Sequence, residues 1–268
     1  EKLGKSVIRT FSRVMANGSQ AVIAPSEKTK QALLQYGVIA PIYIVPTGLD
    51  LSEYDRKNLD ENRVQSIREE LGFTSEDRIV VFVGRIAKEK AIEIPIEAIS
   101  KNADPHLHLV IVGGGTDMEY YQDLAKKYNV SDRVHFTGKI PKENIAYYYA
   151  AFDCFVSASL SETQGMTYIE ALASGLLVFG RRDEVLKDLA DEGKSGYYFD
   201  DANELSQKWD VFFSKSKEER DALRAYCISK TAPYTESMFA HKALSVYNQA
   251  IDDYKRAYHV ERIRMVDD

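Results

Sequence analysis

Cysteine is scarce in this sequence, which has two in 268 residues, Cys154 and Cys227, far apart and without the spacing of a metal site. A disulfide framework is therefore excluded, and we expect a reduced, cytoplasmic protein. No apolar run reaches the length that spans a bilayer, and the first residues lack the apolar core of a signal peptide. A formal charge of −6 also argues against nucleic acid as a general partner.

The residues that are plentiful suit a folded chain of one large or two modest domains, with 44% hydrophobic content, 17 Tyr and 11 Phe. From residue 62 onward, short β-branched runs alternate with helical patterns, which predicts an α/β fold: a Rossmann-like, doubly wound parallel sheet with helices on both faces. The expected strands are 78–83, 107–112, 134–137 with Gly138 as its exit, 154–157, 177–179 and 197–199; the expected helices are 62–71, 91–101, 118–128, 142–151, 166–173, 184–191, 203–213 and 217–229.

The two ends of the chain have a different pattern. Residues 1–17 predict a basic amphipathic helix, which either packs its apolar face on its own domain or lies on anionic lipid. A βαβ unit is expected over residues 21–45, followed by a polar linker over 51–62. The last helix begins near Glu236 and carries an apolar stripe that needs a partner surface. The stripe consists of Ala240, Leu244, Tyr247, Ile251, Tyr254 and Tyr258.

One stretch combines a strand exit, a turn and a helix start between two carboxylates. Glu162 and Glu170 flank Gly165, and residues 166–173 have the composition of a helix. The free N–H groups at a helix start bind anions, while carboxylates accept hydrogen bonds from sugar hydroxyls. The stretch thus predicts a site for a phosphorylated sugar. A capping box between Thr167 and Glu170, which needs no ligand, remains open as an alternative.

Cations follow the strand predicted over 78–83. Gly84 and Arg85 end the strand, and Lys88 and Lys90 come shortly afterwards. Ligands of open α/β sheets lie at this edge, so these side chains are candidate phosphate clamps; the alternative is a solvated loop.

Two further patterns give weaker signals. Residues 113–115 are three glycines after a strand, but they lack the G-x-G-x-x-G spacing of a dinucleotide site, and close backbone packing or the approach of a ligand is enough to explain them. His106 and His108 alternate across a strand start, where a metal pair is conceivable but a surface position is the simpler interpretation. No carboxylate is expected to complete a metal site there.

Four segments in order give the chain a family resemblance: residues 44–49, the Gly84-Arg85 to Glu89-Lys90 loop, the Glu162/Glu170 pair around Gly165, and residues 171–175. Together they resemble the carboxyl-terminal half of a retaining glycosyltransferase of family four, which has the GT-B fold. The resemblance implies that Arg85 and Lys90 grip the donor pyrophosphate, that Glu162 faces the transferred hexose, and that Glu170 holds the ribose hydroxyls. The implied binding set also includes Gly84, Gly165, Met166, Thr167, Gly138, Lys139 and Ile140.

The segment SETQGMTYIEALASG is similar to the branch that makes monoglucosyl diacylglycerol. Several positions depart from the frequent family pattern, since Thr163 and Gln164 replace Gly-Phe, Ala91 replaces Gly, and Tyr168 and Leu177 each replace Pro. The resemblance implies UDP-glucose or a related UDP-sugar as donor, a lipid or sugar acceptor, no metal and no prosthetic group.

The domain boundaries that the resemblance implies are 1–50 for the end of an amino-terminal acceptor domain, 51–77 for linker and first helix, 78–231 for the donor domain, and 232–268 for a helix crossing back. We expect donor binding but little or no transfer by this chain alone, because most of the acceptor side is missing. Contact with the inner face of a membrane is a further expectation. A nucleotide-sugar epimerase and a non-catalytic nucleotide-sugar binding domain remain alternatives.

Overall fold

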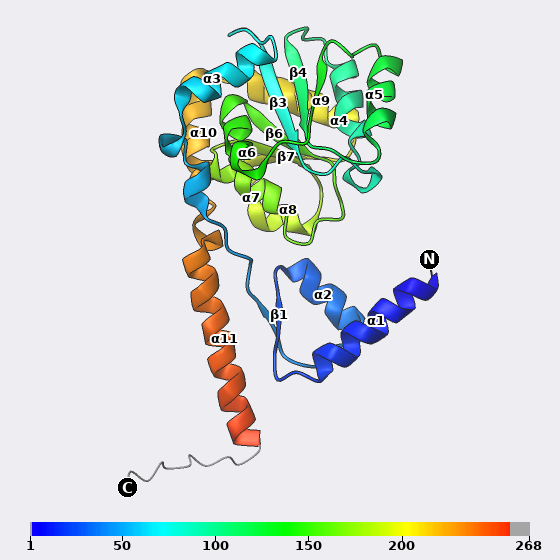
Figure 1. Ribbon diagram of the computed structural model, residues 1–268, viewed down its shortest axis with the longest axis vertical. Helices are drawn as coiled ribbons and strands as arrows, with labels where there is room; N and C mark the ends of the chain where they lie inside the picture. Colours follow the sequence, from blue (N-terminus) through cyan, green and yellow to red (C-terminus); the bar gives the residue numbers. More distant parts are fainter. Residues whose placement is uncertain (1, 258–268) are drawn as a thin grey trace. The chain divides into compact units, whose positions relative to one another are not determined.

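A computed structural model describes residues 2–257, with side chains from Ser6 onward. The chain forms two units (Figure 1). The larger unit extends from Asp50 to Pro233, and the smaller unit combines the residues up to Leu49 with those from Tyr234 onward.

A six-stranded, fully parallel sheet forms the centre of the larger unit, in the order β5-β4-β3-β6-β7-β8. Its central strands are buried on both faces, as uninterrupted apolar runs require in a parallel sheet. This arrangement confirms the predicted fold class. The strands are β3 (Arg78–Val83), β4 (Leu107–Val112), β5 (Val134–Gly138), β6 (Cys154–Ser157), β7 (Leu177–Arg181) and β8 (Gly196–Phe199).

Helices cover both faces of this sheet (Figure 1). One group has α4 packed against α5 and α9, while other contacts join α3 to α6 and α7 to α10. The doubly wound pattern follows from right-handed crossovers running outward in both directions from the centre. The helices are α3 (Glu61–Glu70), α4 (Glu93–Lys101), α5 (Met118–Lys127), α6 (Lys142–Ala151), α7 (Met166–Ala173), α8 (Glu184–Leu189), α9 (Ala202–Phe213) and α10 (Lys217–Ser229).

The strand order reverses between β3 and β6. From β3 the chain runs outward through β4 to β5, returns to β6 beside β3, and then runs the other way through β7 to β8. The loops that leave β3 and β6 therefore diverge at the carboxyl ends of the strands, which is the usual ligand position in such sheets.

The segment predicted as a polar linker is folded onto the larger unit. It forms two 3-10 turns, η1 (Leu51–Tyr54) and η2 (Arg56–Asn58). Tyr54 is only 4% exposed, and its ring meets that of Tyr149 edge-on with the centroids 6.0 Å apart. Burial of this one aromatic ring anchors an otherwise polar segment.

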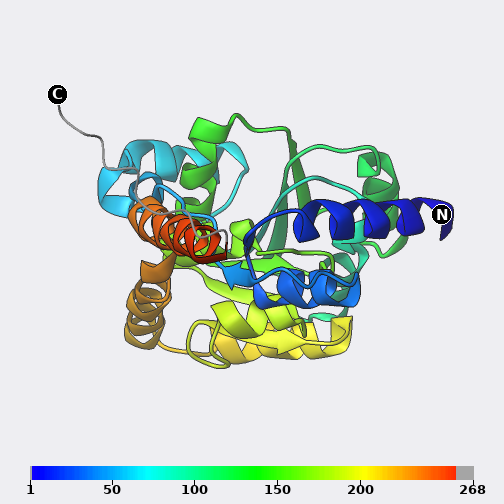
Figure 2. The ribbon, with the colours of Figure 1, turned by 90° about the horizontal axis from the view of Figure 1, so that it is seen from below.

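The smaller unit contains the expected βαβ element, formed by β1 (Val22–Ala24), α2 (Glu27–Gln35) and β2 (Ile42–Ile44), with its two strands parallel. Figure 2 shows α1 (Lys2–Asn17) running beside α2, and the Asn17 side chain donates to the Gly37 carbonyl at 3.2 Å. The last helix, α11 (Glu236–Ala257), packs Ala243 and Val246 against Val45.

Two helices of the smaller unit carry exposed apolar side chains. Val7, Phe11 and Val14 on α1 are each more than 60% exposed, and the stripe on α11 is exposed from Leu244 to Tyr254. Tyr258, the last predicted member of that stripe, lies outside the described residues. No helix within residues 2–257 is long and apolar enough to cross a membrane.

Candidate functional site

An ion pair joins the two loops that diverge at the switch point. Lys90 ends the short turn η3 (Lys88–Lys90) after β3, and Glu162 lies in the loop after β6. The Lys90 Nζ atom is 2.6 Å from the Glu162 Oε1 atom, and the two side chains are 22% and 16% exposed. Sheet topology brings them together, because β3 and β6 are neighbours although Lys90 and Glu162 are far apart in the chain.

Ala91 fixes the backbone directly after Lys90. It adopts a left-handed conformation with φ 50° and ψ 42°, which is uncommon for a residue with a Cβ atom. The following residue, Ile92, is fully buried and anchors the loop to the core. The family that the sequence resembles frequently has glycine here, so the chain retains a glycine-type conformation without the glycine.

Gly165 forms the start of α7 with φ 74°, and no side chain caps this helix end. A Cβ atom at Gly165 would lie 2.8 Å from the Tyr168 ring and 3.2 Å from both Val185 and Leu189. The first helical bond runs from the Tyr168 N–H to the Gly165 carbonyl at 3.0 Å. The N–H groups of Met166 and Thr167 precede that bond, so they belong to the helix turn whose donors suit an anion.

Glu170 projects from α7 toward aromatic residues and not toward the start of the helix. Its Oε2 atom accepts a hydrogen bond of 3.0 Å from the Tyr149 hydroxyl. Burial raises the pKa of the Glu170 carboxyl, while hydrogen bonds from Tyr149 and Tyr54 oppose that rise. Since no side-chain cap is formed at this helix, the capping-box alternative with Thr167 is wrong.

A pocket opens at the carboxyl ends of β3, β4 and β5. Arg85 lines it with a side chain that is 72% exposed and paired with Glu89, separate from the Lys90–Glu162 pair. A Cβ atom at Gly113 would lie 1.9 Å from the Gly84 carbonyl oxygen, so close backbone packing explains that glycine. The lining residues are Val83, Gly84, Arg85, Val112, Gly113, Gly114, Gly115, Lys139, Ile140 and Ile145.

The structure thus sorts the sequence-predicted residues into three places in the larger unit. Lys90 and Glu162 form an ion pair, and Gly165 to Glu170 form the first turns of α7. The pocket beside β3 brings together Gly84, Arg85, Lys139 and Ile140, and Gly138 ends the adjoining strand β5.

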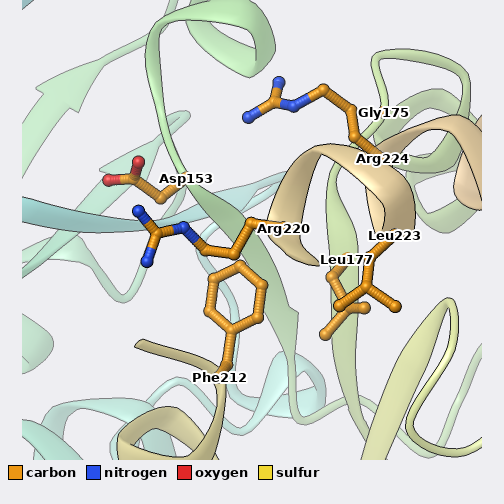
Figure 3. A pocket seen from close by; sticks show the side chains of 7 residues that line it. All are labelled: Asp153, Gly175, Leu177, Phe212, Arg220, Leu223 and Arg224. Atoms are coloured by element: carbon orange, nitrogen blue, oxygen red, sulfur yellow. The ribbon is translucent and has the colours of Figure 1, made fainter. Parts of the chain in front are cut away.

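A second hollow lies at the opposite, amino-terminal edge of the sheet (Figure 3). Asp153, which precedes β6, and Arg220 point toward one another there, and Arg224 lines the same hollow. The Asp153 carboxylate accepts a 2.7 Å hydrogen bond from the Ile79 N–H. This contact ties β6 to the start of β3, and none of the predicted site residues lines the hollow.

The two histidines at the same edge of the sheet differ from the prediction, because a carboxylate contacts both of them and His108 is not at the surface. Asp77 does meet both of them, with its Oδ1 atom 3.2 Å from His106 Nδ1 and 3.4 Å from His108 Nε2. His108 is largely buried and also contacts His135 at 3.2 Å. Burial lowers the pKa of His108. Among residues 2–257 no group of His, Cys, Asp or Glu is arranged to hold a metal ion.

Sequence reasoning missed Tyr149 and Tyr54, the two partners of Glu170. Tyr149 is fully buried in the tyrosine-rich helix α6, and Tyr54 lies in the segment that was expected to be a linker. The only sequence signal was a single large aromatic residue within a polar segment, which indicates an anchor.

Family models match both parts of the chain. Residues 63–229 match the model described as "Glycosyl transferases group 1", and residues 1–53 match "Glycosyltransferase Family 4". The chain belongs to the group 1 glycosyltransferases. The first match covers the six-stranded sheet and every predicted site residue, and it confirms the resemblance.

Relatives of this glycosyltransferase chain include two alpha-monoglucosyldiacylglycerol synthases. The protein of Acholeplasma laidlawii is 28% identical over 232 residues, covering 86% of this chain and 58% of the relative. That of Streptococcus pneumoniae is 32% identical over 197 residues, covering 72% and 45%. The chain therefore spans about half the length of these relatives.

Solved structures support the fold. Anabaena Alr3699/HepE in complex with UDP-glucose superimposes with a TM-score of 0.81 at 18% identity, covering 91% of this chain and 68% of that one. Sucrose-phosphate synthase from Thermosynechococcus elongatus gives 0.78 at 24% identity, covering 91% and 62%. At these identities the likeness concerns the fold alone.

Proposed function

We propose that this chain is the donor-binding part of a retaining glycosyltransferase that uses UDP-glucose. The observation that carries the proposal is the Lys90–Glu162 ion pair at the switch point. It places a cation and a carboxylate where an α/β sheet binds its ligand, close in sequence to the uncapped start of α7. A nucleotide diphosphate sugar presents matching groups, namely a dianionic linkage and a polyol.

In the proposed complex, the base and the two ends of the diphosphate occupy different parts of the site. The pocket beside β3 takes the uridine, with the backbone from Gly138 to Ile140 as its platform and Gly84 and Arg85 on the side of the phosphates. Glu170 accepts hydrogen bonds from the ribose hydroxyls. The N–H groups of Met166 and Thr167 approach the phosphate next to the sugar.

Transfer requires stabilisation of the charge that develops on the leaving UDP. We assign this role to Lys90, Arg85 and the amino-terminal dipole of α7, three positive groups placed before the reaction begins. Glu162 faces the hexose and accepts from its hydroxyls. The proposal needs no metal or prosthetic group, because two cations and a helix end can neutralise a diphosphate.

The proposed acceptor is a diacylglycerol-type lipid. The support is the likeness to the two alpha-monoglucosyldiacylglycerol synthases, both of which are about twice as long as the matched region. Transfer then belongs to an intact enzyme that includes an acceptor-binding domain. We expect the 268-residue chain to bind the nucleotide-sugar donor without transferring the sugar.

We also propose that α1 contacts the anionic inner face of a membrane. Val7, Phe11 and Val14 are exposed on the helix, which also carries Arg9 and Arg13. Cosedimentation with vesicles that contain phosphatidylglycerol tests this proposal. Phe11→Ser should reduce binding, and neutral vesicles should bind less protein; equal binding to both vesicle types would contradict the charge contribution.

Calorimetric titration tests the donor site directly. UDP-glucose, UDP-galactose and UDP-GlcNAc are titrated against wild type, Lys90→Ala and Glu170→Ala. Lys90→Ala should weaken UDP-glucose binding about tenfold or more through loss of a charge-assisted contact. Lys127→Ala is the matched control, since Lys127 is an exposed lysine in the last turn of α5 and is not among the predicted site residues. Equal affinity in all these proteins would remove the proposed site.

A further inference from the structure

The surroundings of Glu170 consist of two tyrosine hydroxyls from separate segments. Tyr149 comes from the middle of α6, and Tyr54 ends η1, immediately after the boundary between the two units. The Tyr149 hydroxyl donates to Glu170 Oε2 at 3.0 Å and is 3.4 Å from the Thr167 carbonyl oxygen. The Tyr54 hydroxyl also acts on Glu170, because its proximity lowers the pKa of the Glu170 carboxyl. Both tyrosine side chains are buried.

The aromatic rings of Tyr54 and Tyr149 also pack against each other. Their centroids are 6.0 Å apart in an edge-on contact, and the Tyr149 ring meets Phe155 of β6 at 6.0 Å on another side. A phenol ring has few rotatable bonds, so a buried and stacked tyrosine presents its hydroxyl from a fixed point. The Glu170 carboxylate is thus oriented by a rigid Tyr149 donor, which the Tyr54 ring buttresses, and not by a flexible cation.

From this geometry we propose that Tyr149 and Tyr54 are positioning residues that make Glu170 specific for a ribose diol. The inference rests on the proposed function, in which Glu170 meets the ribose of the donor. A carboxylate has about four acceptor positions on its two oxygens. The Tyr149 hydroxyl occupies one of these positions, and the Tyr54 ring packs edge-on against the Tyr149 ring and holds that donor in place, so the remaining positions face a ligand with two adjacent hydroxyls.

The choice of neutral donors has a consequence for discrimination. A lysine or arginine partner would bind the carboxylate strongly, and the carboxylate would then accept further hydrogen bonds only weakly. Tyrosine hydroxyls keep acceptor capacity available, and a nucleotide that lacks one ribose hydroxyl then leaves a partly buried carboxylate position unpaired. Sites built to bind a hydroxyl reject analogues without it strongly for this reason.

The charged groups around Glu170 determine how pH affects the site. Burial raises the pKa of Glu170, the hydrogen bonds from Tyr149 and Tyr54 lower it, Lys142 on α6 lowers it, and Glu53 on η1 raises it. Removal of a tyrosine hydroxyl should therefore raise the Glu170 pKa further. Because a protonated carboxyl group loses acceptor capacity, UDP affinity in such a variant should fall off at a higher pH than in the wild type.

The test compares UDP with 2′-deoxy-UDP and 3′-deoxy-UDP by calorimetry in wild type, Tyr149→Phe and Tyr54→Phe. Wild type should prefer UDP, and each variant should reduce that preference by about three- to tenfold. Tyr148→Phe is the matched control, because it removes the hydroxyl of the neighbouring buried tyrosine on the same helix and should leave the preference unchanged. The affinity ratio is measured within each protein, so a change in the folded fraction cancels.

Two further arms separate positioning from packing. Tyr149→Phe in a Glu170→Gln background should cause no additional loss of the preference for UDP. In the single variant Tyr149→Phe, the pH at which UDP affinity is halved should be higher than in wild type. An unchanged preference for UDP in both tyrosine variants would overturn the inference. Wild type that binds UDP and its deoxy analogues equally would also overturn it while leaving nucleotide binding intact, whereas a wild type that binds no UDP would remove the proposed function itself.

Discussion

Glu162 and Glu170 flank the same glycine and belong to the same short segment, but their carboxylates have different kinds of partner. Glu162 pairs with the Lys90 ammonium group across two neighbouring strands. Glu170 receives a hydrogen bond from the Tyr149 hydroxyl, and the nearby Tyr54 hydroxyl lowers the pKa of its carboxyl. One carboxylate is therefore held by charge and the other by neutral donors.

This difference suits two different tasks. A charged partner beside Glu162 can exchange its carboxylate contact for a phosphate when the donor arrives, because Lys90 carries three rotatable donors on a flexible stem. Neutral, rigid partners keep Glu170 in one orientation throughout. Under the proposed function, we expect the Glu162 side to change partners when the donor binds and the Glu170 side to hold the nucleotide in one orientation.

The largest expected effect comes from neutralising the Glu162 carboxylate, which pairs with Lys90. Glu162→Gln in the intact enzyme should lower kcat for glucosyl transfer by about 100- to 1000-fold, because a preorganised charge next to the hexose is lost. The KM for UDP-glucose should change little, since Glu170 and the base pocket are untouched. Steady-state kinetics measures both constants.

Glu143→Gln provides the control for this substitution. Glu143 is an exposed carboxylate in the first turn of α6 and should tolerate the change with normal kinetics. If kcat in Glu162→Gln stayed within a factor of a few of wild type, the assignment of Glu162 to the reacting sugar would be wrong.

The glycine between the two carboxylates gives the next largest effect. Gly165→Ala should lower the free energy of unfolding by about 2–3 kcal/mol, because a Cβ atom is strained in the left-handed conformation and would crowd neighbouring side chains. The nearest of these is Tyr168, at 2.8 Å. Urea unfolding monitored by circular dichroism measures the change. Gly72→Ala is the control, since Gly72 has φ 79° but no atom within 4 Å of its Cβ position, so it separates backbone strain from crowding.

The neutral side should respond to pH. Burial raises the pKa of Glu170, so UDP affinity should weaken on acidification at a pH above the ordinary range of a glutamate side chain. The contribution of this carboxyl to folding has the opposite sign: a raised folded-state pKa makes the fold more stable as pH falls.

Calorimetry across pH checks the binding trend, and Glu170→Gln should remove most of it. A pH profile of UDP affinity that is identical in wild type and Glu170→Gln would show that another group is responsible. Opposite trends for binding and unfolding in the wild type would distinguish Glu170 from a group that simply destabilises the protein in acid.

The strands of the fold could be predicted closely because their signal is local. Arg78–Val83, Leu107–Val112 and Cys154–Ser157 have the bounds expected from their apolar runs. The strand expected to end at Phe179 continues to Arg181, because Gly180 pairs with Tyr198 of β8 in the sheet. Pairing with a neighbouring strand, which the local pattern does not contain, sets that end.

The candidate site could be predicted in its residues but not in its partners. The sequence indicated Lys90, Glu162 and Glu170, while the ion pair between the first two depends on β3 and β6 being adjacent. In the sequence, Tyr54 is more than a hundred residues from Glu170, and Tyr149 is about twenty residues from it. No periodic pattern indicates either contact. For the same reason, the meeting of His108 with Asp77 was not foreseen.

The smallest expected effect concerns the loop that carries Lys90. Ala91 holds a left-handed conformation with φ 50°, so Ala91→Gly should raise the free energy of unfolding by about 0.5–1 kcal/mol through relief of strain, offset in part by the greater freedom of glycine in the unfolded chain. Urea unfolding measures this gain. UDP-glucose affinity should stay the same, because the backbone that positions Lys90 keeps its conformation. A weaker affinity in Ala91→Gly would instead show that the strained alanine helps to hold Lys90 rigidly against Glu162, which would make the charged side of the site less mobile than its comparison with Glu170 indicates.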